Sequence, residues 1–280
     1  MENIRDKRLI PANKRIGWIK SYPECNAPNL VDGELKRVVC PFANLLSEPR
    51  GGRVRQLIYG DIFRVLEENE GFSFGFNKFD GYVGYIQNDK LKKRTTKTTH
   101  WVSSLSTQIY EQPDIKKEYL SSLSFGSQLE IVNAEKDFCE TIDGGFVPRQ
   151  HLRKKEHFYS DPVMVAKIFL GIPYVWGGNT CWGIDCSGLI QAAFRGCGID
   201  LPADSDQQEA ACIKISELNE IKRNDLMFWD RHVALVIDPN YLIHANAFHM
   251  SVTLESIKTV CKRIQFDQND KFRFCRYEVS

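Results

Sequence analysis

The chain has 280 residues and an almost balanced charge, with 37 lysines and arginines against 36 aspartates and glutamates. A net charge of +1 and 26% charged residues are ordinary for a globular protein and do not indicate a nucleic-acid partner. Nine cysteines without a CxxC pair favour reduced thiols in a cytosol over a disulfide framework. We expect a cytoplasmic protein, because the N-terminus lacks the apolar core of a signal peptide and no apolar run reaches membrane-spanning length.

The length exceeds what one small core needs, so the sequence predicts several modules. Trp18 and Tyr22 belong to an N-terminal extension of unassigned role and are expected to pack on the module that follows. Lys90–Thr99, rich in lysine and threonine, is the expected linker between the second and third modules. The predicted boundaries are 1–32 for the extension, 33–93 and 100–155 for two β-barrels, and 157–280 for the last module.

A repeated pattern predicts that the two β-rich modules arose by duplication. Gly60 in the first corresponds to Gly126 in the second, and Gly81 corresponds to Gly145. The offsets, 126 minus 60 and 145 minus 81, are 66 and 64, and a near-constant period marks internal repetition. Each copy alternates apolar and polar residues over short runs bounded by glycines, which is typical of a small β-barrel. Both copies resemble bacterial SH3 domains, which are often attached to wall hydrolases.

The last module contains a cysteine with the sequence context of a nucleophile. Asp185-Cys186-Ser187-Gly188 follows a loop rich in glycine and tryptophan, and apolar positions 189, 190, 193, 194 and 197 then recur at helical spacing. This places Cys186 in the first turn of a helix, where unpaired N–H groups favour negative charge and are expected to lower the thiol pKa. A cysteine is more commonly a small buried apolar residue, but the polar and glycine neighbours favour a reactive thiol here.

Two histidines lie on consecutive predicted strands downstream of the cysteine. His232 begins the apolar run Val233–Ile237, and His244 follows Tyr241-Leu242-Ile243 after a turn at residues 238–240. Such a hairpin would place both imidazoles side by side, so that the second ring could hold the first in the tautomer that accepts the thiol proton. Either histidine alone could be structural, but the order cysteine, histidine, histidine favours nucleophilic catalysis.

Several motifs occur here in the order found in one family. The segment from Phe169 to Met250 resembles the catalytic domain of the NlpC/P60 cysteine peptidases, a circularly permuted papain-like fold. The matching stretches are residues 170–178, 183–189, 201–208, 224–229 and the two histidine strands. The resemblance implies an α+β chain, with a permuted papain-like domain after two small SH3-like β-barrels. It also implies Cys186 as the nucleophile, His232 as the base and His244 as the orienting third residue.

Polar residues near the cysteine are candidates for binding the substrate. Attack on a carbonyl needs donors for the developing oxyanion, and the backbone N–H of Cys186 and the hydroxyl of Tyr174 are candidates. Tyr174 could instead be a core aromatic residue. The resemblance adds four candidates for the pocket of a γ-D-glutamyl residue, Asp185, Ser187, Asp204 and Ser205. Of these, Asp204 and Ser205 could equally cap the helix that follows them.

The first barrel contains two further candidates, Asp61 and Tyr82. In several members of the resembled family, a carboxylate and a tyrosine of this domain grip the free amine of an N-terminal L-alanine. A buried carboxylate facing an ammonium would discriminate against N-acylated substrates, which leave the carboxylate unpaired. The alternative is that Asp61 is a turn residue and Tyr82 a core tyrosine, and the family more often has the longer glutamate in this role.

Together the motifs predict a cysteine endopeptidase that hydrolyses the γ-D-glutamyl–diamino acid bond of cell-wall muropeptides. The resemblance implies meso-diaminopimelate as the diamino acid, and a small partner such as L-Ala-γ-D-Glu-meso-diaminopimelate with a free N-terminal L-Ala, which fits murein recycling. The alternative is a peptidoglycan-binding wall hydrolase or an exported effector that acts on intact wall. Acyl transfer on a related fold is disfavoured, because those enzymes place the histidine before the cysteine.

We expect no cofactor and no catalytic metal. No histidine pair has the spacing of metal ligands on one helix, and no CxxC accompanies them. The glycine-rich stretch at residues 177–180 lacks the lysine that grips phosphates. The sequence predicts neither the oligomeric state nor the preferred stem length.

Overall fold

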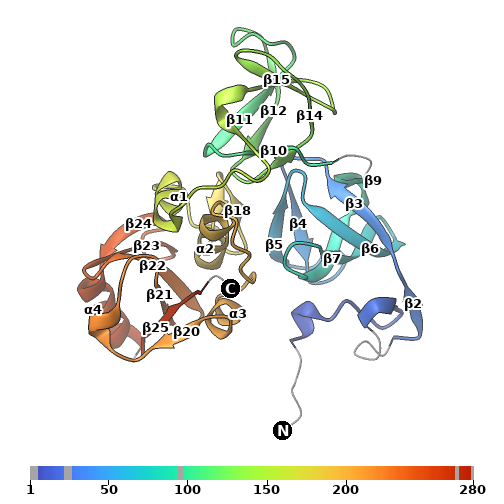
Figure 1. The fold of residues 1–280 in the computed structure, drawn as a ribbon. Coiled ribbons are helices and arrows are strands. Elements are labelled where there is room, and N and C mark those ends of the chain that lie inside the picture. The colour runs from blue at the N-terminus through green and yellow to red at the C-terminus, as the bar shows by residue number, and fades with distance from the viewer. Residues whose placement is uncertain (1–5, 22–26, 94–96, 269–270, 279–280) are drawn as a thin grey trace. The chain divides into compact units, whose positions relative to one another are not determined.

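The computed structural model describes residues 6–21, 27–93, 97–268 and 271–278. The chain forms two compact units, one made of residues 1–102 and 106–154, the other of residues 103–105 and 155–280 (Figure 1). The first unit is rich in strands and the second mixes helices with a sheet, which confirms the predicted α+β class. None of the helices in the described part of the chain combines the length and apolarity needed to cross a membrane.

The first barrel is a single antiparallel sheet. Its strands are β3 (Glu34–Val38), β4 (Phe42–Leu46), β5 (Arg53–Ile58), β6 (Ile62–Asn69), β7 (Phe72–Asn77), β8 (Val83–Gln87) and, after the 3₁₀ turn η3 (Asn88–Lys90), β9 (Leu91–Lys93). They lie in the order β5-β4-β8-β7-β6-β3-β9. Along β6, Phe63 and Val65 are buried while Ile62 and Arg64 are partly exposed. This period of two fits a strand with one face on a core.

The N-terminal extension packs on the first barrel through Trp18. It contains η1 (Lys7–Leu9), β1 (Ile16–Trp18), η2 (Ile19–Ser21) and β2 (Asn29–Val31), and β1 pairs with β2 in parallel. The Trp18 ring lies 4.9 Å from the ring of Phe76, centroid to centroid, and joins a cluster with Leu66 and Phe74. The expectation for Trp18 is therefore confirmed, whereas Tyr22 and residues 94–96 of the expected linker lie outside the described residues.

The second barrel splits into two sheets. Its elements are β10 (His100–Val102), β11 (Ser106–Tyr110), β12 (Tyr119–Ser124), β13 (Gln128–Leu129), β14 (Ile131–Ala134), β15 (Phe138–Thr141), β16 (Phe146–Pro148), η4 (Arg149–His151) and β17 (Leu152–Lys154). One sheet has the order β13-β10-β17 and the other β12-β11-β16-β15-β14. The glycines matched in the repeat have similar positive φ angles, 85° for Gly60 with 83° for Gly126, and 76° for Gly81 with 87° for Gly145. These turns favour glycine because other residues rarely adopt that backbone conformation.

A partly buried polar contact joins the two barrels. Arg37 of β3 donates to the carboxylate of Asp143, and the Tyr59 hydroxyl donates to the same carboxylate at 2.5 Å. The N–H of Gln128 donates to the Tyr59 carbonyl at 2.9 Å. A Cβ atom on Gly60 would lie 2.2 Å from the Gln128 carbonyl oxygen, so this close approach needs glycine. Together, these contacts hold the two barrels in one unit.

The second unit is built on a six-stranded sheet. Its elements are α1 (Pro162–Ile168), β18 (Asn179–Thr180), β19 (Gly183–Ile184), α2 (Cys186–Arg195), α3 (Ser205–Ala210), β20 (Ile213–Ile215), η5 (Leu218–Glu220), β21 (Leu226–Trp229), β22 (His232–Asp238), β23 (Tyr241–Asn246), β24 (Ser251–Ser256), α4 (Ile257–Gln268) and β25 (Arg273–Arg276). The sheet order is β20-β25-β21-β22-β23-β24. Helix α2 packs along β22 and β23, and α4 adds Val260 and Ile264 to a core cluster with Met227 and Leu242.

The contact between the barrels gives a stability prediction. Asp143→Asn should lower the free energy of unfolding by about 2 kcal/mol, because the buried Arg37 guanidinium loses its carboxylate partner. The control is Asp89→Asn, since the exposed Asp89–Lys90 pair should contribute no more than about 0.5 kcal/mol. Urea unfolding of the full chain measures both variants. Equal losses of unfolding free energy in the two variants would contradict a stabilising contact between Arg37 and Asp143.

Candidate active site

Helix α2 begins at Cys186, in agreement with the sequence prediction, and Asp185, predicted only as a substrate-pocket residue, is its N-cap. Its carboxylate accepts the N–H of Gly188 at 2.7 Å, which caps the helix, and the N–H of Gly177 at 2.7 Å, which ties the preceding loop to it. A Cβ atom on Gly188 would lie 2.6 Å from the Gly178 carbonyl oxygen, so the loop can pass this close only to glycine. Cys186 is consequently the first residue of α2, with its thiol buried.

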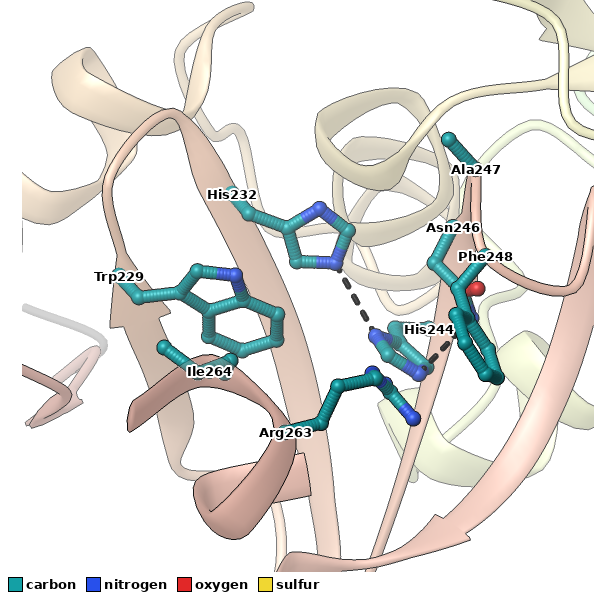
Figure 2. A pocket seen from close by; sticks show the side chains of 8 residues that line it. All are labelled: Trp229, His232, His244, Asn246, Ala247, Phe248, Arg263 and Ile264. Carbon is teal, nitrogen blue, oxygen red and sulfur yellow. Dashed lines mark hydrogen bonds between the residues drawn. The ribbon is translucent and has the colours of Figure 1, made fainter. Parts of the chain in front are cut away.

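The two histidines lie side by side on β22 and β23, as expected for the predicted hairpin. His232 Nε2 is 3.0 Å from His244 Nδ1, and the two ring planes are almost perpendicular, at 88°. The indole of Trp229 stacks on His232 with ring centroids 4.3 Å apart, and Figure 2 shows it beside the hydrogen-bonded imidazoles. Trp229 thus shields one side of the His232–His244 hydrogen bond from water.

Helix α2, which begins at Cys186, packs against β22, the strand that begins at His232. The backbone N–H groups of Val233 and Ser187 favour the thiolate and act to lower the pKa of Cys186. Burial, followed by the charge of Asp185, outweighs them and raises this pKa to about 12. The expectation that the helix start would lower this pKa below its ordinary value is therefore wrong. Desolvation of the buried sulfur is the larger effect.

The pKa values of the two imidazoles are shifted downward, opposite to that of the thiol. Burial lowers the pKa of His232 well below its ordinary range, and the neighbouring His244 and the charge of Arg263 lower it further. His244 is completely buried, and burial likewise lowers its pKa, against the opposing hydrogen bond to Glu255. Thiol and imidazole are therefore both uncharged at rest. In the predicted mechanism, the thiolate therefore forms together with proton transfer to His232, rather than in advance of the reaction.

A pocket of about 210 Å³ adjoins the histidine pair (Figure 2). It combines aromatic walls with polar groups and includes both imidazoles. Its lining residues are Trp229, His232, His244, Asn246, Ala247, Phe248, Arg263 and Ile264.

Tyr174 lies near the thiol, as its predicted role requires. Its backbone N–H donates to the carbonyl of Met250 at 2.9 Å, which anchors its segment beside β24. Burial raises the pKa of Tyr174 to about 12, and the charges of Cys186 and then Asp185 add to this shift. The hydroxyl is half-buried and stays protonated, so it can donate a hydrogen bond. Its oxyanion role remains a prediction.

The remaining candidates of this unit lie at the starts of α2 and α3. The Ser187 hydroxyl donates to Asp185 at 3.2 Å. Asp204 caps α3 in a reciprocal capping box with Gln207, whose side chain accepts the Asp204 N–H at 3.2 Å, and Ser205 is the first helical residue. The cap interpretation of Asp204 is therefore confirmed, while the role of these residues in substrate binding remains a prediction.

Asp61 and Tyr82 belong to the other compact unit. Asp61 is 2% exposed, and its carboxylate accepts the N–H of Ile58 at 2.9 Å across a turn. Tyr82 is 5% exposed, and its N–H donates to Asp80 at 3.1 Å. Both residues therefore have the structural roles that the alternative interpretation assigns to them. A role in amine recognition remains a prediction.

The sequence interpretation did not include three residues around His244. Glu255 Oε2 lies 2.8 Å from His244 Nε2, Asn246 Nδ2 lies 2.9 Å from the same nitrogen, and Arg263 binds Glu255. A signal existed for Glu255. Thr253 pairs directly with His244 across the β23–β24 hairpin, and Glu255, two residues further on, shares its face. Arg263 comes from α4, and no local pattern relates it to this site.

Comparisons with known proteins agree with this geometry. The NlpC/P60 family matches residues 171–266, and the bacterial dipeptidyl-peptidase SH3 domain matches residues 45–91. Dipeptidyl-peptidase 6 of Lysinibacillus sphaericus is 26% identical over 245 residues, which cover 79% of this chain and 90% of that protein. The γ-D-glutamyl-L-lysine dipeptidyl-peptidase of Bacillus subtilis (strain 168) is 27% identical over 184 residues, covering 59% of this chain and 60% of that protein.

Among solved structures, an NlpC/P60 family protein from Bacillus cereus ATCC 10987 has the same fold, with a TM-score of 0.75 at 17% identity. The superposition covers 87% of this chain and 99% of that one. The protein thus contains a cysteine peptidase domain of the NlpC/P60 family, at residues 171–266. It joins this peptidase domain to a bacterial SH3 domain and is homologous to dipeptidyl-peptidase 6 and the γ-D-glutamyl-L-lysine dipeptidyl-peptidases.

The buried imidazoles predict that acid destabilises this domain. The pKa of His244 is lower in the folded state than the ordinary value of ~6.5, so its contribution to stability is complete above that pH and is lost as the pH falls below it. The free energy of unfolding should fall between pH 7 and pH 5. Each such group contributes a slope of at most ~1.4 kcal/mol per pH unit. His244→Gln should flatten this slope in urea unfolding, whereas His157→Gln, at an exposed position, should leave it unchanged. Identical slopes in both variants would contradict the assignment.

The position of Tyr174 predicts a loss of turnover without its hydroxyl. Tyr174→Phe should lower kcat roughly 10²-fold, the usual cost of a lost oxyanion donor, while KM changes little. The matched control is Tyr159→Phe, which removes a hydroxyl that donates to the Ser103 carbonyl at 2.9 Å in the same unit. Steady-state kinetics that give equal kcat values for the two variants would remove Tyr174 from the oxyanion site.

Proposed function

We propose that this protein hydrolyses the bond between γ-D-glutamate and a diamino acid in small muropeptides that carry a free N-terminal L-alanine. The observation that supports this most strongly is the hydrogen-bonded His232–His244 pair on β22 and β23, against which α2 packs with Cys186 as its first residue. The names of the homologues support a γ-D-glutamyl substrate. The proposed setting is murein recycling in the cytoplasm, with meso-diaminopimelate or L-lysine as the diamino acid.

The first half of the proposed reaction forms a thioester. The Cys186 thiol gives its proton to His232 as the sulfur attacks the γ-carbonyl carbon of D-glutamate. The backbone N–H of Cys186 and the hydroxyl of Tyr174 donate to the resulting oxyanion. When the tetrahedral intermediate collapses, the C–N bond breaks and the amine of the diamino acid leaves with the proton from His232.

The second half regenerates the enzyme. A water molecule gives a proton to His232 and attacks the thioester carbonyl, and the same two donors stabilise the second oxyanion. Collapse breaks the C–S bond, releases the γ-carboxylate of L-Ala-D-Glu, and returns the proton from His232 to the Cys186 sulfur. Because one imidazole accepts and donates in turn, its neutral resting state suits both steps.

The proposed selectivity for a free amine involves the first barrel. Asp61 would pair with the ammonium group of the N-terminal L-alanine, and Tyr82 would contact the same group. The support is the match of residues 45–91 to the bacterial dipeptidyl-peptidase SH3 domain, which includes both residues. A buried carboxylate is expected to reject an N-acylated stem, which offers it no positive charge.

The test uses L-Ala-γ-D-Glu-meso-diaminopimelate, its L-lysine counterpart and the N-acetylated form of each, with products identified by mass spectrometry. We expect release of L-Ala-D-Glu from the free-amine peptides only, and no cleavage by Cys186→Ala. Activity in Cys186→Ala would contradict the mechanism. Cleavage of isolated wall sacculi, with N-acetylated and free peptides cut equally, would instead favour a wall hydrolase.

Asp61→Asn separates recognition from structure. Asparagine can still accept the N–H of Ile58 through its side-chain oxygen, so the turn should survive while the negative charge is lost. We expect KM for the free-amine peptide to rise roughly 10-fold or more, and the preference over the N-acetylated peptide to shrink, with an unchanged melting temperature. An unchanged preference would leave Asp61 as a turn residue only.

A further inference from the structure

A carboxylate and a guanidinium continue the hydrogen-bonded histidine pair beyond His244, the predicted third catalytic residue. His244 Nε2 lies 2.8 Å from Glu255 Oε2, and Arg263 donates to both oxygens of Glu255, at 2.7 and 2.8 Å. The exposed fractions of the side chains are 0% for His244, 9% for Glu255 and 19% for Arg263. The Arg263 guanidinium also lies over the Phe248 ring at 4.3 Å, which fixes its position. This is a continuous hydrogen-bonded chain in a largely dry environment.

The chain of hydrogen bonds determines which imidazole nitrogens carry protons. A carboxylate only accepts, so His244 Nε2 must donate to Glu255. The neutral His244 ring then has a bare Nδ1, which must accept the Nε2 proton of His232. His232 in turn keeps a bare Nδ1, the nitrogen free to take the proton of Cys186. In this arrangement the base is ready for the reaction.

Asn246, in contrast to Glu255, favours the opposite placement of protons on the two imidazoles. Its Oδ1 accepts the backbone N–H of His249 at 2.8 Å, which turns its amide nitrogen toward His244 Nε2, 2.9 Å away. If this amide donated to Nε2, every proton along the histidine pair would shift to the other nitrogen. His232 Nδ1 would then be protonated and unable to accept a proton from the thiol. One of the two neighbours of His244 therefore supports catalysis and the other opposes it.

We propose that Glu255, held by Arg263, is a positioning residue that selects the productive tautomer of His244 and, through it, that of His232. The inference rests on the proposed function only in taking Cys186 as the nucleophile and His232 as its base. An ionised carboxylate is a stronger partner than a neutral amide, so Glu255 prevails over Asn246. The bidentate contact with Arg263 keeps Glu255 ionised in spite of its burial. His249 Nδ1 lies 3.6 Å from Glu255 Oε2, beyond hydrogen-bond distance, and 3.1 Å from Asn246 Oδ1.

Glu255→Gln tests this assignment with almost no change in shape. Arg263 should keep the amide oxygen, so that the NH₂ group faces His244 and favours the unproductive tautomer. We expect kcat on the proposed peptide substrate to fall on the order of 10²-fold, with KM nearly unchanged. A wrong tautomer forced by a direct neighbour of the base costs ~10⁴ in another enzyme, and this contact is one residue further away.

The decisive experiment adds Asn246→Asp to the Glu255→Gln variant and measures how much kcat recovers. The new carboxylate lies beside the same Nε2 and can accept its proton, so we expect the double variant to regain roughly 10-fold in kcat. A merely structural role for Glu255 would not produce this recovery. A double variant no faster than Glu255→Gln would overturn the proposal.

The matched control is Glu209→Gln. Glu209 also forms a bidentate pair with an arginine of the same unit, Arg273, at 2.5 and 3.1 Å, but touches neither imidazole. The Glu209→Gln variant should lose about as much stability as Glu255→Gln and keep kcat within about threefold of the wild-type value. If Glu255→Gln does not fold, Arg263→Lys replaces it, because a lysine cannot bridge both oxygens and should lower kcat in the same direction by a smaller factor. Wild-type kcat in the folded variant would overturn the proposal.

A substrate-independent measurement separates this inference from the proposed function. The rate at which iodoacetamide alkylates Cys186, followed by peptide mass spectrometry, depends on the base but on no peptide substrate. If the wild type cleaves none of the muropeptides and Cys186 is still alkylated several-fold faster than in Glu255→Gln, the substrate proposal fails and the positioning role stands. Equal alkylation rates would overturn the positioning role, whatever the substrate.

Discussion

The proposed chemistry depends on a buried thiol that stays protonated until a neutral imidazole takes its proton. Burial raises the pKa of Cys186 and lowers that of His232, so each shift favours the uncharged pair. A pair of this kind works only if the lone pair of the imidazole points at the sulfur. Geometry and tautomer therefore matter more here than the ionisation of either group alone. The surrounding sheet, the capped helix and Trp229 all serve to hold that geometry.

Local signals in the sequence predicted much of this architecture. The helix beginning at Cys186 follows from the apolar spacing after Gly188. The hairpin of His232 and His244 follows from two apolar runs around a turn, and a hairpin brings its strands together without further information. The duplicated barrels follow from glycines that recur at a near-constant offset, since the turns at those positions need positive φ angles. Each of these features is encoded within a few residues.

The sequence could not predict features that arise from packing between distant segments. The direction of the Cys186 pKa shift depends on how completely the sulfur is desolvated, which no local pattern reveals. The contact of Arg263 with Glu255 requires α4 to fold back on β24. The hydrogen bonds of Arg37 and Tyr59 to Asp143 require one barrel to contact the other. In both clusters, charged side chains that look like ordinary surface residues in the sequence pair with a partly or fully buried partner.

The central claim is that His232 presents an unprotonated Nδ1 to the thiol. Long-range ¹H–¹⁵N spectra of the ¹⁵N-histidine-labelled protein at pH 7 report directly which nitrogen of each ring carries the proton. We predict protonated Nε2 and bare Nδ1 in both His232 and His244. A proton on Nδ1 of His232 in the resting enzyme would contradict it.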